Sequence, residues 1–421
     1  MPWSARLGTM ASQINPPRGM RDFLPTEKTV RNDLLSKIVG TYASHGFQEI
    51  ETPALEAIER LSSGDGGDNE KLAFRVLKRG EELEAALGKD ADELSDLGLR
   101  YDLTVPLTRY YATNHAKLPK VFKAIQTGPV WRAERPQKGR YRQFVQCDID
   151  IIGDDTNFAE IEILNASLNA LSAIGIKDAK IRINHRELLS SSIASLGVAP
   201  SDFGKAMITI DKLDKIGPDG VALEMKERFG DKIADATSSW LSSLSSNPQI
   251  PSELNEIFEA VEQLHPGKLR FDPTLVRGMG YYTGSIFEIE HSASGSSIGG
   301  GGRYDGMVGK WLGTEVAAVG VSIGFERVAE LVSDSPASSK SLVLIFEPAE
   351  QQAALSVQTE AIAAGYLVRL EPAPKKLNVL LDSLKDQGMA EFAVLEEPKN
   401  GFQGLNIKLA LIVIKRPASP N

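Results

Sequence analysis

The segment GPVWRAERPQKGRYRQFVQCDIDIIG (residues 128–153) decides the fold of this chain. It carries five cationic side chains between Arg132 and Arg142, and it then alternates apolar and polar residues up to Asp148 and Asp150. This alternation predicts one strand on each side of a turn that contains Pro and Gly. Cations near the turn and carboxylates further along the strand can therefore line one pocket. Such a pocket suits a substrate with an anionic end and a cationic end.

Strand parity assigns side chains of this hairpin to faces. Arg132 and Glu134 share a face on the first strand. On the second strand, one face carries Arg140, Arg142, Gln146, Asp148 and Asp150. Arginine grips a phosphate in a fixed orientation better than lysine does. Cys147 has the opposite parity, so we expect it to face away from the pocket and to be structural. The plain alternative for the whole segment is a solvated hairpin with ordinary surface charges.

Composition limits the class of protein. The chain has 421 residues, 47 Lys and Arg against 56 Asp and Glu, and a net charge of −9. This length predicts about two or three domains, and the charge excludes a globally basic DNA-binding surface while leaving room for a local RNA-binding patch. The single cysteine excludes an internal disulfide framework and a zinc site built on cysteines. No apolar run has the length of a membrane span or a secretory signal, so we expect a cytoplasmic protein.

Patterns along the chain predict a mixture of helices and strands. Apolar residues at helical spacing predict helices over residues 26–45 and 155–175. Strand-like composition predicts strands within residues 97–112 and 121–152, and Pro53 belongs at a sheet edge or an interface. The strands are joined by hairpins and long excursions, which favours an antiparallel sheet.

Composition also predicts the domain limits. Residues 1–15 are expected to be a flexible leader and residues 16–332 the main domain, with a mostly helical subdomain inserted at about 170–265. The segment SDSPASSK (333–340) has the composition of a linker. Residues 341–421 alternate strands and helices, which predicts a separate α/β domain with a mixed or parallel sheet.

Several segments together resemble one family. ERPQKGRYRQF resembles the second signature motif of class II aminoacyl-tRNA synthetases, and in particular that of the histidyl-tRNA synthetase family. Other segments similar to that family occur in order along the chain: PPRGMRDFLP (16–25), QEIETPALE (48–56), LRYDLTVPLTRY (99–110), RGMGYYTGSIFE (277–288), GGGGRYDGMVG (299–309) and IGFERV (323–328). The resemblance implies an α+β fold, with a class II antiparallel sheet and flanking helices, a helical insertion and a C-terminal α/β anticodon-binding domain.

The resemblance also implies an activity. The family activates L-histidine with ATP to histidyl-adenylate and pyrophosphate, with Mg²⁺, and transfers histidine to the 3′ end of tRNA(His). It implies a homodimer with Pro53 at the interface, and neither a DNA nor a membrane partner. Both reactants of the first step are anionic, so the reaction needs charge neutralisation and positioning more than acid–base chemistry.

By this resemblance, a set of charged residues handles the nucleotide. Arg132 would hold the α-phosphate and the reacting carboxylate, and Glu134 would read the adenine. Arg140 would reach the outer phosphates, and Arg327 would grip the nucleotide from the opposite side. Arg277 would supply a second cation at the α-phosphate, as in the histidine enzymes. No residues are assigned to hold a resident metal.

The remaining candidates would form a histidine pocket. Asp102, Thr104 and Gln146 have the side-chain types that bind an amino group, and Asp150 and Tyr282 would pair with the two imidazole nitrogens. Such a polar pocket discriminates steeply, because a wrong side chain leaves buried polar groups without partners.

Alternatives stay open for some residues and for the whole chain. Tyr281 is a further candidate for the histidine pocket, or a packing residue. Arg327 could be a helix-surface charge, and Arg277 could be paired with Asp272. The family has an acid where this chain has Gly280, which removes a charge near the site and bears on how Arg277 is oriented. The competing hypotheses are a regulatory subunit of ATP phosphoribosyltransferase, which shares the fold without the anticodon module, and an RNA-binding module.

Overall fold

The computed structural model describes the following residues: 14–62, 72–136, 139–244, 248–278, 280–332, 340–386, 389, 391–395 and 401–409. Nearly all of the predicted leader, most of the predicted linker and the end of the chain from residue 410 lie outside them. The chain divides into a first unit of Met1–Asp22 with Leu34–Ser333 and a second unit of Phe23–Asp33 with Asp334–Asn421. The domain limits predicted from composition stay a prediction.

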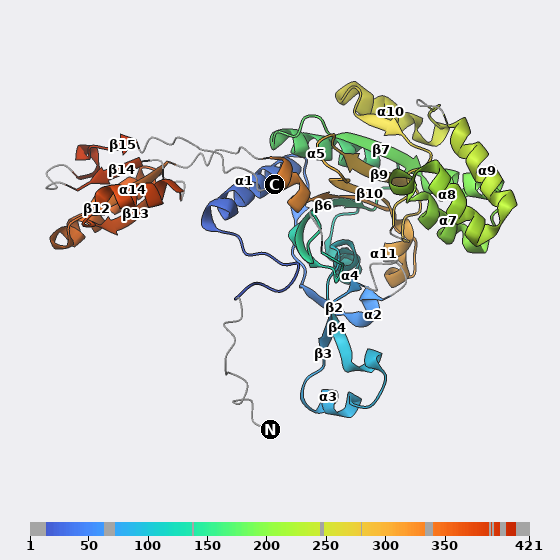
Figure 1. The fold of residues 1–421 in the computed structure, drawn as a ribbon, viewed down its shortest axis with the longest axis horizontal. Coiled ribbons are helices and arrows are strands. Elements are labelled where there is room, and N and C mark those ends of the chain that lie inside the picture. Colours follow the sequence, from blue (N-terminus) through green and yellow to red (C-terminus); the bar gives the residue numbers. More distant parts are fainter. Residues whose placement is uncertain are drawn as a thin grey trace. The chain divides into compact units, whose positions relative to one another are not determined.

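An eight-stranded sheet forms the centre of the first unit, within the part of the chain that is described (Figure 1). In spatial order its strands are β1 (Gln48–Glu49), β5 (Phe122–Trp131), β6 (Gln143–Ile152), β11 (Ala318–Gly324), β10 (Gly299–Arg303), β9 (Ser285–Glu290), β7 (Lys180–His185) and β8 (Leu269–Phe271). The pairings from β5 to β7 are antiparallel, whereas β1 and β8 pair in parallel with their neighbours at the two edges. The predicted antiparallel sheet is therefore confirmed for all but its edges.

Helices that pack beside the sheet complete the core of the first unit. They are α1 (Pro25–Ser44, which spans both units), α4 (Thr104–Asn114), α5 (Phe158–Ala173), α11 (Asp305–Leu312) and α12 (Phe325–Leu331). Leu107 and Tyr111 of α4 join Met307 and Val308 of α11 in one buried apolar cluster. The helices predicted over residues 26–45 and 155–175 are present as α1 and α5.

The strand predicted over residues 97–112 is wrong for most of its length. Strand β4 (Ser95–Leu99) ends early, and α4 begins at Thr104. The β-branched and aromatic residues of this stretch favour a strand by propensity. The Asp102 carboxylate, however, accepts the Val105 backbone N–H at 3.1 Å. Pro106 lies in the first turn of α4, where backbone N–H groups have no acceptor within the helix. A proline there, which lacks an N–H, costs no helical hydrogen bond. These helix-start features outweigh the propensity.

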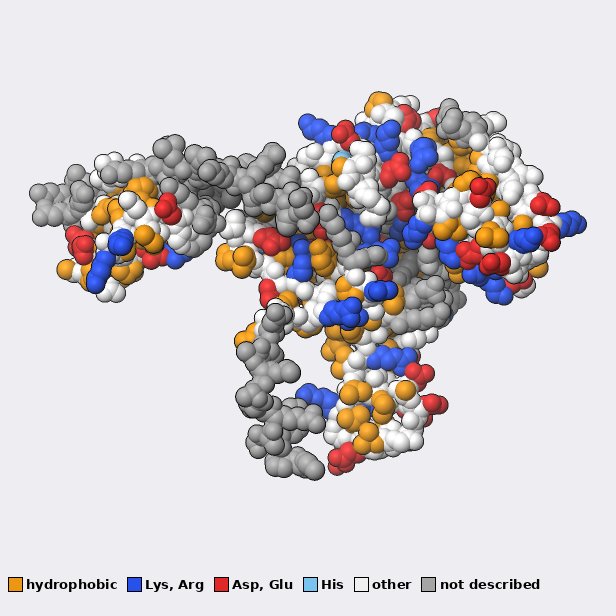
Figure 2. Space-filling model, in the orientation of Figure 1, with side chains coloured by type: hydrophobic (Ala, Val, Ile, Leu, Met, Phe, Trp, Pro, Cys, Tyr) orange, Lys and Arg blue, Asp and Glu red, His pale blue; other side chains and the backbone are white. Residues whose placement is uncertain are grey.

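A small sheet projects from the main one, with α3 at its tip (Figure 1). It consists of β2 (Leu55–Ala57), β4 and β3 (Arg75–Leu77), and it is accompanied by α2 (Ile58–Leu61) and α3 (Gly80–Ala86). Figure 2 shows apolar side chains gathered on this projection, where Leu77 and Leu87 are more than half exposed.

Helices of the inserted region lie beside the β7 and β9 side of the sheet (Figure 1). They are α6 (Arg186–Ser195), α7 (Phe203–Ile210), α8 (Leu213–Phe229), α9 (Asp231–Ser243) and α10 (Ser252–Leu264). Met207, Val221 and Met225 belong to a separate apolar cluster that also takes in Val276 of the main body. Helix α8 is interrupted after its first residues by Gly217, at φ 70°, which precedes Pro218.

The second unit has the predicted strand–helix alternation. Its sheet runs β13 (Leu367–Pro372), β12 (Ser341–Phe346), β14 (Glu391–Val394), β15 (Lys408–Leu409), in parallel except for β15. Alternate residues of β12 join separate apolar clusters, one with α13 (Gln351–Ala363) and one with α14 (Leu377–Asp386). A strand that is buried on both faces explains the continuous apolar run SLVLIF.

Candidate active site

Two adjoining cavities open in the first unit. The outer cavity, of about 560 Å³, is lined among others by Glu134, Arg140 and Arg327. The inner cavity, of about 70 Å³, is lined among others by Asp102 and Asp150. They share five lining residues, namely Arg132, Gln146, Arg277, Gly300 and Ser322. Thr104, Tyr281 and Tyr282 also line the inner cavity. Each candidate residue predicted from the sequence thus lines at least one of the two cavities.

The outer cavity gathers arginines from distant parts of the chain. The Arg132 Nε donates to the Tyr101 carbonyl at 2.9 Å, and its guanidinium lies over the Phe144 ring. Arg327, in the first turn of α12, donates to the Ser297 carbonyl. Burial lowers the pKa of Arg327, and the positive charges of Arg140 and Arg132 lower it further. Backbone carbonyls and an aromatic ring do not neutralise a guanidinium, so the positive charges of Arg132 and Arg327 can attract an anion.

Arg277, like Arg132, lines both cavities. It lies in the loop before β9 and donates from Nη1 to the Glu288 carboxylate at 3.2 Å. Its Nε is buried and has no hydrogen-bond partner among the described residues. A Cβ added at Gly300 would lie 2.8 Å from its guanidinium carbon, so a glycine of the GGGG run makes room for it. Its carboxylate partner is Glu288 rather than Asp272, the alternative raised by the sequence.

Strand pairing creates the inner cavity. The polar residues of β6 lie opposite small residues of β11: Gln146 opposite Gly324, Asp148 opposite Ser322, and Asp150 opposite Gly320. A Cβ at Gly320 would lie 1.9 Å from Asp150 Oδ1, so a side chain there would displace the carboxylate. Cys147 is buried and is not among the residues lining either cavity, as its parity predicts.

Burial raises the pKa of the carboxyl groups of the inner cavity. It raises the pKa of Asp102 to about 6 and that of Asp150 to about 7. Burial, together with the neighbouring charge of Asp150, also raises the pKa of Asp148 well above its usual range. Asp102 Oδ2 and Gln146 Oε1 are buried acceptors without a partner among the described residues. Unpaired acceptors beside destabilised carboxylates favour a cationic guest.

Sequence reasoning assigned no role to Asp148, Tyr304 and Ser322, which also line the inner cavity. The Tyr304 hydroxyl donates to Asp150 Oδ1 at 2.6 Å and so fixes that carboxylate. The parity of Asp148, equal to that of Gln146 and Asp150, was the available signal for it. Tyr304 and Ser322 gave no comparable signal, because both come from distant segments. Ser322 reaches β6 through the pairing of β11 with β6, and Tyr304 through its hydrogen bond to Asp150.

Comparison with known proteins identifies the family. The family model described as Histidyl-tRNA synthetase matches residues 19–328. A histidine–tRNA ligase of Leifsonia xyli subsp. xyli is 48% identical over 415 residues, covering 92% of this chain and 96% of that protein. The chain belongs to the histidyl-tRNA synthetase family. The expected enzyme class, a class II aminoacyl-tRNA synthetase, is therefore confirmed.

Further relatives agree with this family. A probable histidine–tRNA ligase of Tropheryma whipplei (strain Twist) is 43% identical over 95% of this chain and all of that protein. Two solved structures share the fold. They are histidyl-tRNA synthetase from Nostoc sp. PCC 7120 (TM-score 0.73, 23% identity, 94% of this chain and 95% of that one) and an ATP phosphoribosyltransferase regulatory subunit/histidyl-tRNA synthetase from Bacillus halodurans C (TM-score 0.71, 20% identity, 89% and 97%).

Among the described residues, no group of three or more His, Cys, Asp or Glu side chains could hold a metal ion. Within the same residues, no helix is long and apolar enough to cross a membrane.

Proposed function

We propose that this chain is a histidine–tRNA ligase whose two cavities hold the two substrates of amino-acid activation. The observation that supports this most is their junction: the inner cavity, with unpaired acceptors on Asp102 and Gln146, opens at Arg132 and Arg277 into the arginine-lined outer cavity. An amino acid bound with its ammonium inside would present its carboxylate to the arginines. ATP would occupy the outer cavity.

In the first step, a carboxylate oxygen of histidine forms a bond to the α-phosphorus of ATP, and the bond from that phosphorus to the bridging oxygen breaks. Pyrophosphate leaves with the bonding electron pair. Arg132 and Arg277 neutralise the charge that develops at the phosphorus. Glu134 reads the adenine, and Arg140 and Arg327 hold the outer phosphates. Mg²⁺ is expected to arrive bound to the ATP phosphates.

Recognition of histidine uses the inner cavity. Asp102 and Gln146 accept from the α-ammonium, with Thr104 beside them. Asp150, held by Tyr304, accepts from one ring nitrogen, and Tyr282 pairs with the other. An amino acid without an imidazole would leave these buried groups unpaired, which costs far more than a misfit of apolar groups. Tyr281 contacts Tyr282 edge to face, with 4.8 Å between ring centroids, and supports its placement.

The partners follow from the same assignment. The second step transfers histidine to the 3′ end of tRNA(His), and we assign the α/β sheet of the second unit to anticodon binding. The exposed apolar side chains of the small sheet, Leu55, Leu77 and Leu97, suit a homodimer interface close to Pro53. We expect the protein to act in the cytoplasm and to bind neither DNA nor a membrane.

Histidine-dependent ATP–pyrophosphate exchange tests the proposed function. The purified chain is assayed with each standard amino acid, and we expect exchange with histidine alone. A regulatory subunit would bind histidine but show no exchange, and exchange with another amino acid would refute the pocket assignment. The presence of Arg132, Arg277 and Arg327 at one cavity, and of a second unit, supports the enzyme over that alternative.

A further inference from the structure

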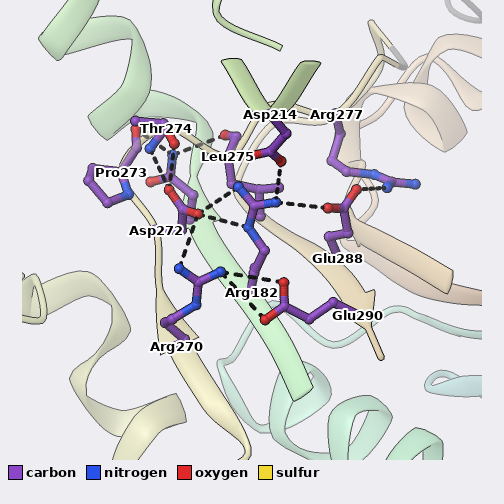
Figure 3. A network of polar contacts seen from close by, with 11 residues as sticks. Arg182, Asp214, Arg270, Asp272, Pro273, Thr274, Leu275, Arg277, Glu288 and Glu290 are labelled. Carbon is purple, nitrogen blue, oxygen red and sulfur yellow. Dashed lines mark hydrogen bonds and ion pairs between the residues drawn. The ribbon is translucent and has the colours of Figure 1, made fainter. Parts of the chain in front are cut away.

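A chain of ion pairs reaches Arg277 from the neighbouring strands (Figure 3). Arg182 on β7 and Glu288 on β9 are direct partners in the sheet register. The Glu288 carboxylate lies between two arginines: Oε1 accepts from Arg182 Nη1 and Oε2 from Arg277 Nη1, both at 3.2 Å. One carboxylate thus links Arg277 to the sheet.

Arg182 is itself fixed on several sides. Its Nε donates to Asp272 Oδ2 at 2.8 Å, and its Nη2 lies 2.7 Å from the same oxygen. The backbone N–H and hydroxyl of Thr274 donate to the other Asp272 oxygen at 2.9 and 2.7 Å. Asp214, at the start of α8 in the insertion, accepts from Arg182 Nη1 at 2.8 Å. Since the Arg182 side chain is only 10% exposed, its position is determined by these partners.

Arg277 needs such an anchor. It lies in an irregular loop before β9. Glu288 holds Nη1 and leaves Nε unpaired, so one edge of the guanidinium remains for a phosphate. Gly300, opposite Glu288 in the sheet, leaves room for the guanidinium, because a Cβ there would lie 2.8 Å from the guanidinium carbon.

We propose that Glu288, held by Arg182, is a positioning residue that orients Arg277 for attack at the α-phosphorus. This inference rests on the proposed function. Glu288 acts through Arg277 and has no chemical role of its own. Loss of its charge should lower the rate of adenylate formation and leave histidine affinity nearly unchanged, because Glu288 is not among the residues that line the inner cavity.

The sheet supplies a matched control. Glu290 lies two residues further along β9, on the same face, and pairs with Arg270 at 3.4 Å (Figure 3). Glu288→Gln and Glu290→Gln therefore make the same chemical change in neighbouring cross-strand ion pairs, and only the first contact reaches Arg277. A general weakening of the sheet would affect both variants alike.

Single-turnover adenylate formation and histidine binding are measured for both variants, with melting temperatures as a check on folding. We expect Glu288→Gln to lower the rate about 10- to 100-fold, the scale for a misplaced catalytic group, and Glu290→Gln to change it less than about twofold. Because Glu288 works through Arg277, we expect Glu288→Gln to have little further effect in an Arg277→Ala background.

Equal rates for the two single variants, or additive losses in the double variant, would overturn the positioning role. If histidine-dependent exchange is absent from the wild-type chain, the proposed function itself fails. The two failures are thus distinguishable.

Discussion

Asp102→Asn should change the pH dependence of folding stability. The Asp102 carboxyl is buried, its Oδ2 has no partner among the described residues, and burial raises its pKa from 3.8 to about 6. The folded state therefore binds the Asp102 proton more tightly than the unfolded state does. Asparagine can still accept the Val105 N–H through Oδ1 and brings no charge into the cavity.

The size of the effect follows from the two pKa values. Full ionisation of Asp102 costs the folded state about 3 kcal/mol, at about 1.4 kcal/mol for each pH unit between 3.8 and about 6. The cost is absent below pH 3.8, grows as the pH rises, and is complete above about pH 6. Between about pH 4.5 and about pH 7.5 the wild type should lose about 2 kcal/mol relative to the Asn variant.

Urea unfolding at these two pH values provides the assay. The fluorescence of Trp131, Trp240 and Trp311 reports on the first unit, which contains all three. Asp90→Asn, a change at an exposed carboxyl, is the control and should show little pH-dependent difference. A wild type that gains stability relative to Asp102→Asn as the pH rises, or a difference that does not vary with pH, would refute the reasoning.

Other variants test the remaining parts of the site. Asp150→Ala and Tyr282→Phe should chiefly weaken histidine recognition, and retained selectivity over other amino acids in the exchange assay would contradict the pocket assignment. Gly300→Ala should destabilise the fold by about 1–3 kcal/mol and slow adenylate formation, because the new Cβ would lie 2.6 Å from the Phe287 carbonyl and 2.8 Å from Arg277. Gly204→Ala, where nothing lies within 4 Å of the added Cβ, is its control, and equal melting temperatures for the two would be evidence against this packing argument.

The fold was largely predictable because its signals are local. Strand parity in the opening segment placed Gln146 and Asp150 on one face and Cys147 on the other, and the alternation of strands and helices after residue 340 predicted an α/β domain. Helix α4 was not predicted, because its start depends on an Asp102 contact that outweighs strand propensity.

Parts of the site could not be read from the sequence, because strand register brings them together. The pairing of β6 with β11 puts Ser322 beside Asp148, and the pairing of β7 with β9 puts Arg182 beside Glu288. The partner of Arg277 is accordingly Glu288, eleven residues away, and not the nearer Asp272. The GGGG run by itself does not predict a particular structure. It forms most of strand β10, and Gly300 in it lies against the Arg277 side chain.

Arg132 and Arg277 are proposed to act on one phosphorus, while the acids and tyrosines of the inner cavity supply most of the contacts that hold histidine. Rapid-quench measurement of adenylate formation by Arg277→Ala, with histidine binding measured on the same protein, tests this assignment most directly. We expect a rate of adenylate formation about 10²–10³-fold lower than that of the wild type and an almost unchanged histidine affinity. A wild-type rate, or a loss of histidine binding as large as the loss of rate, would contradict it.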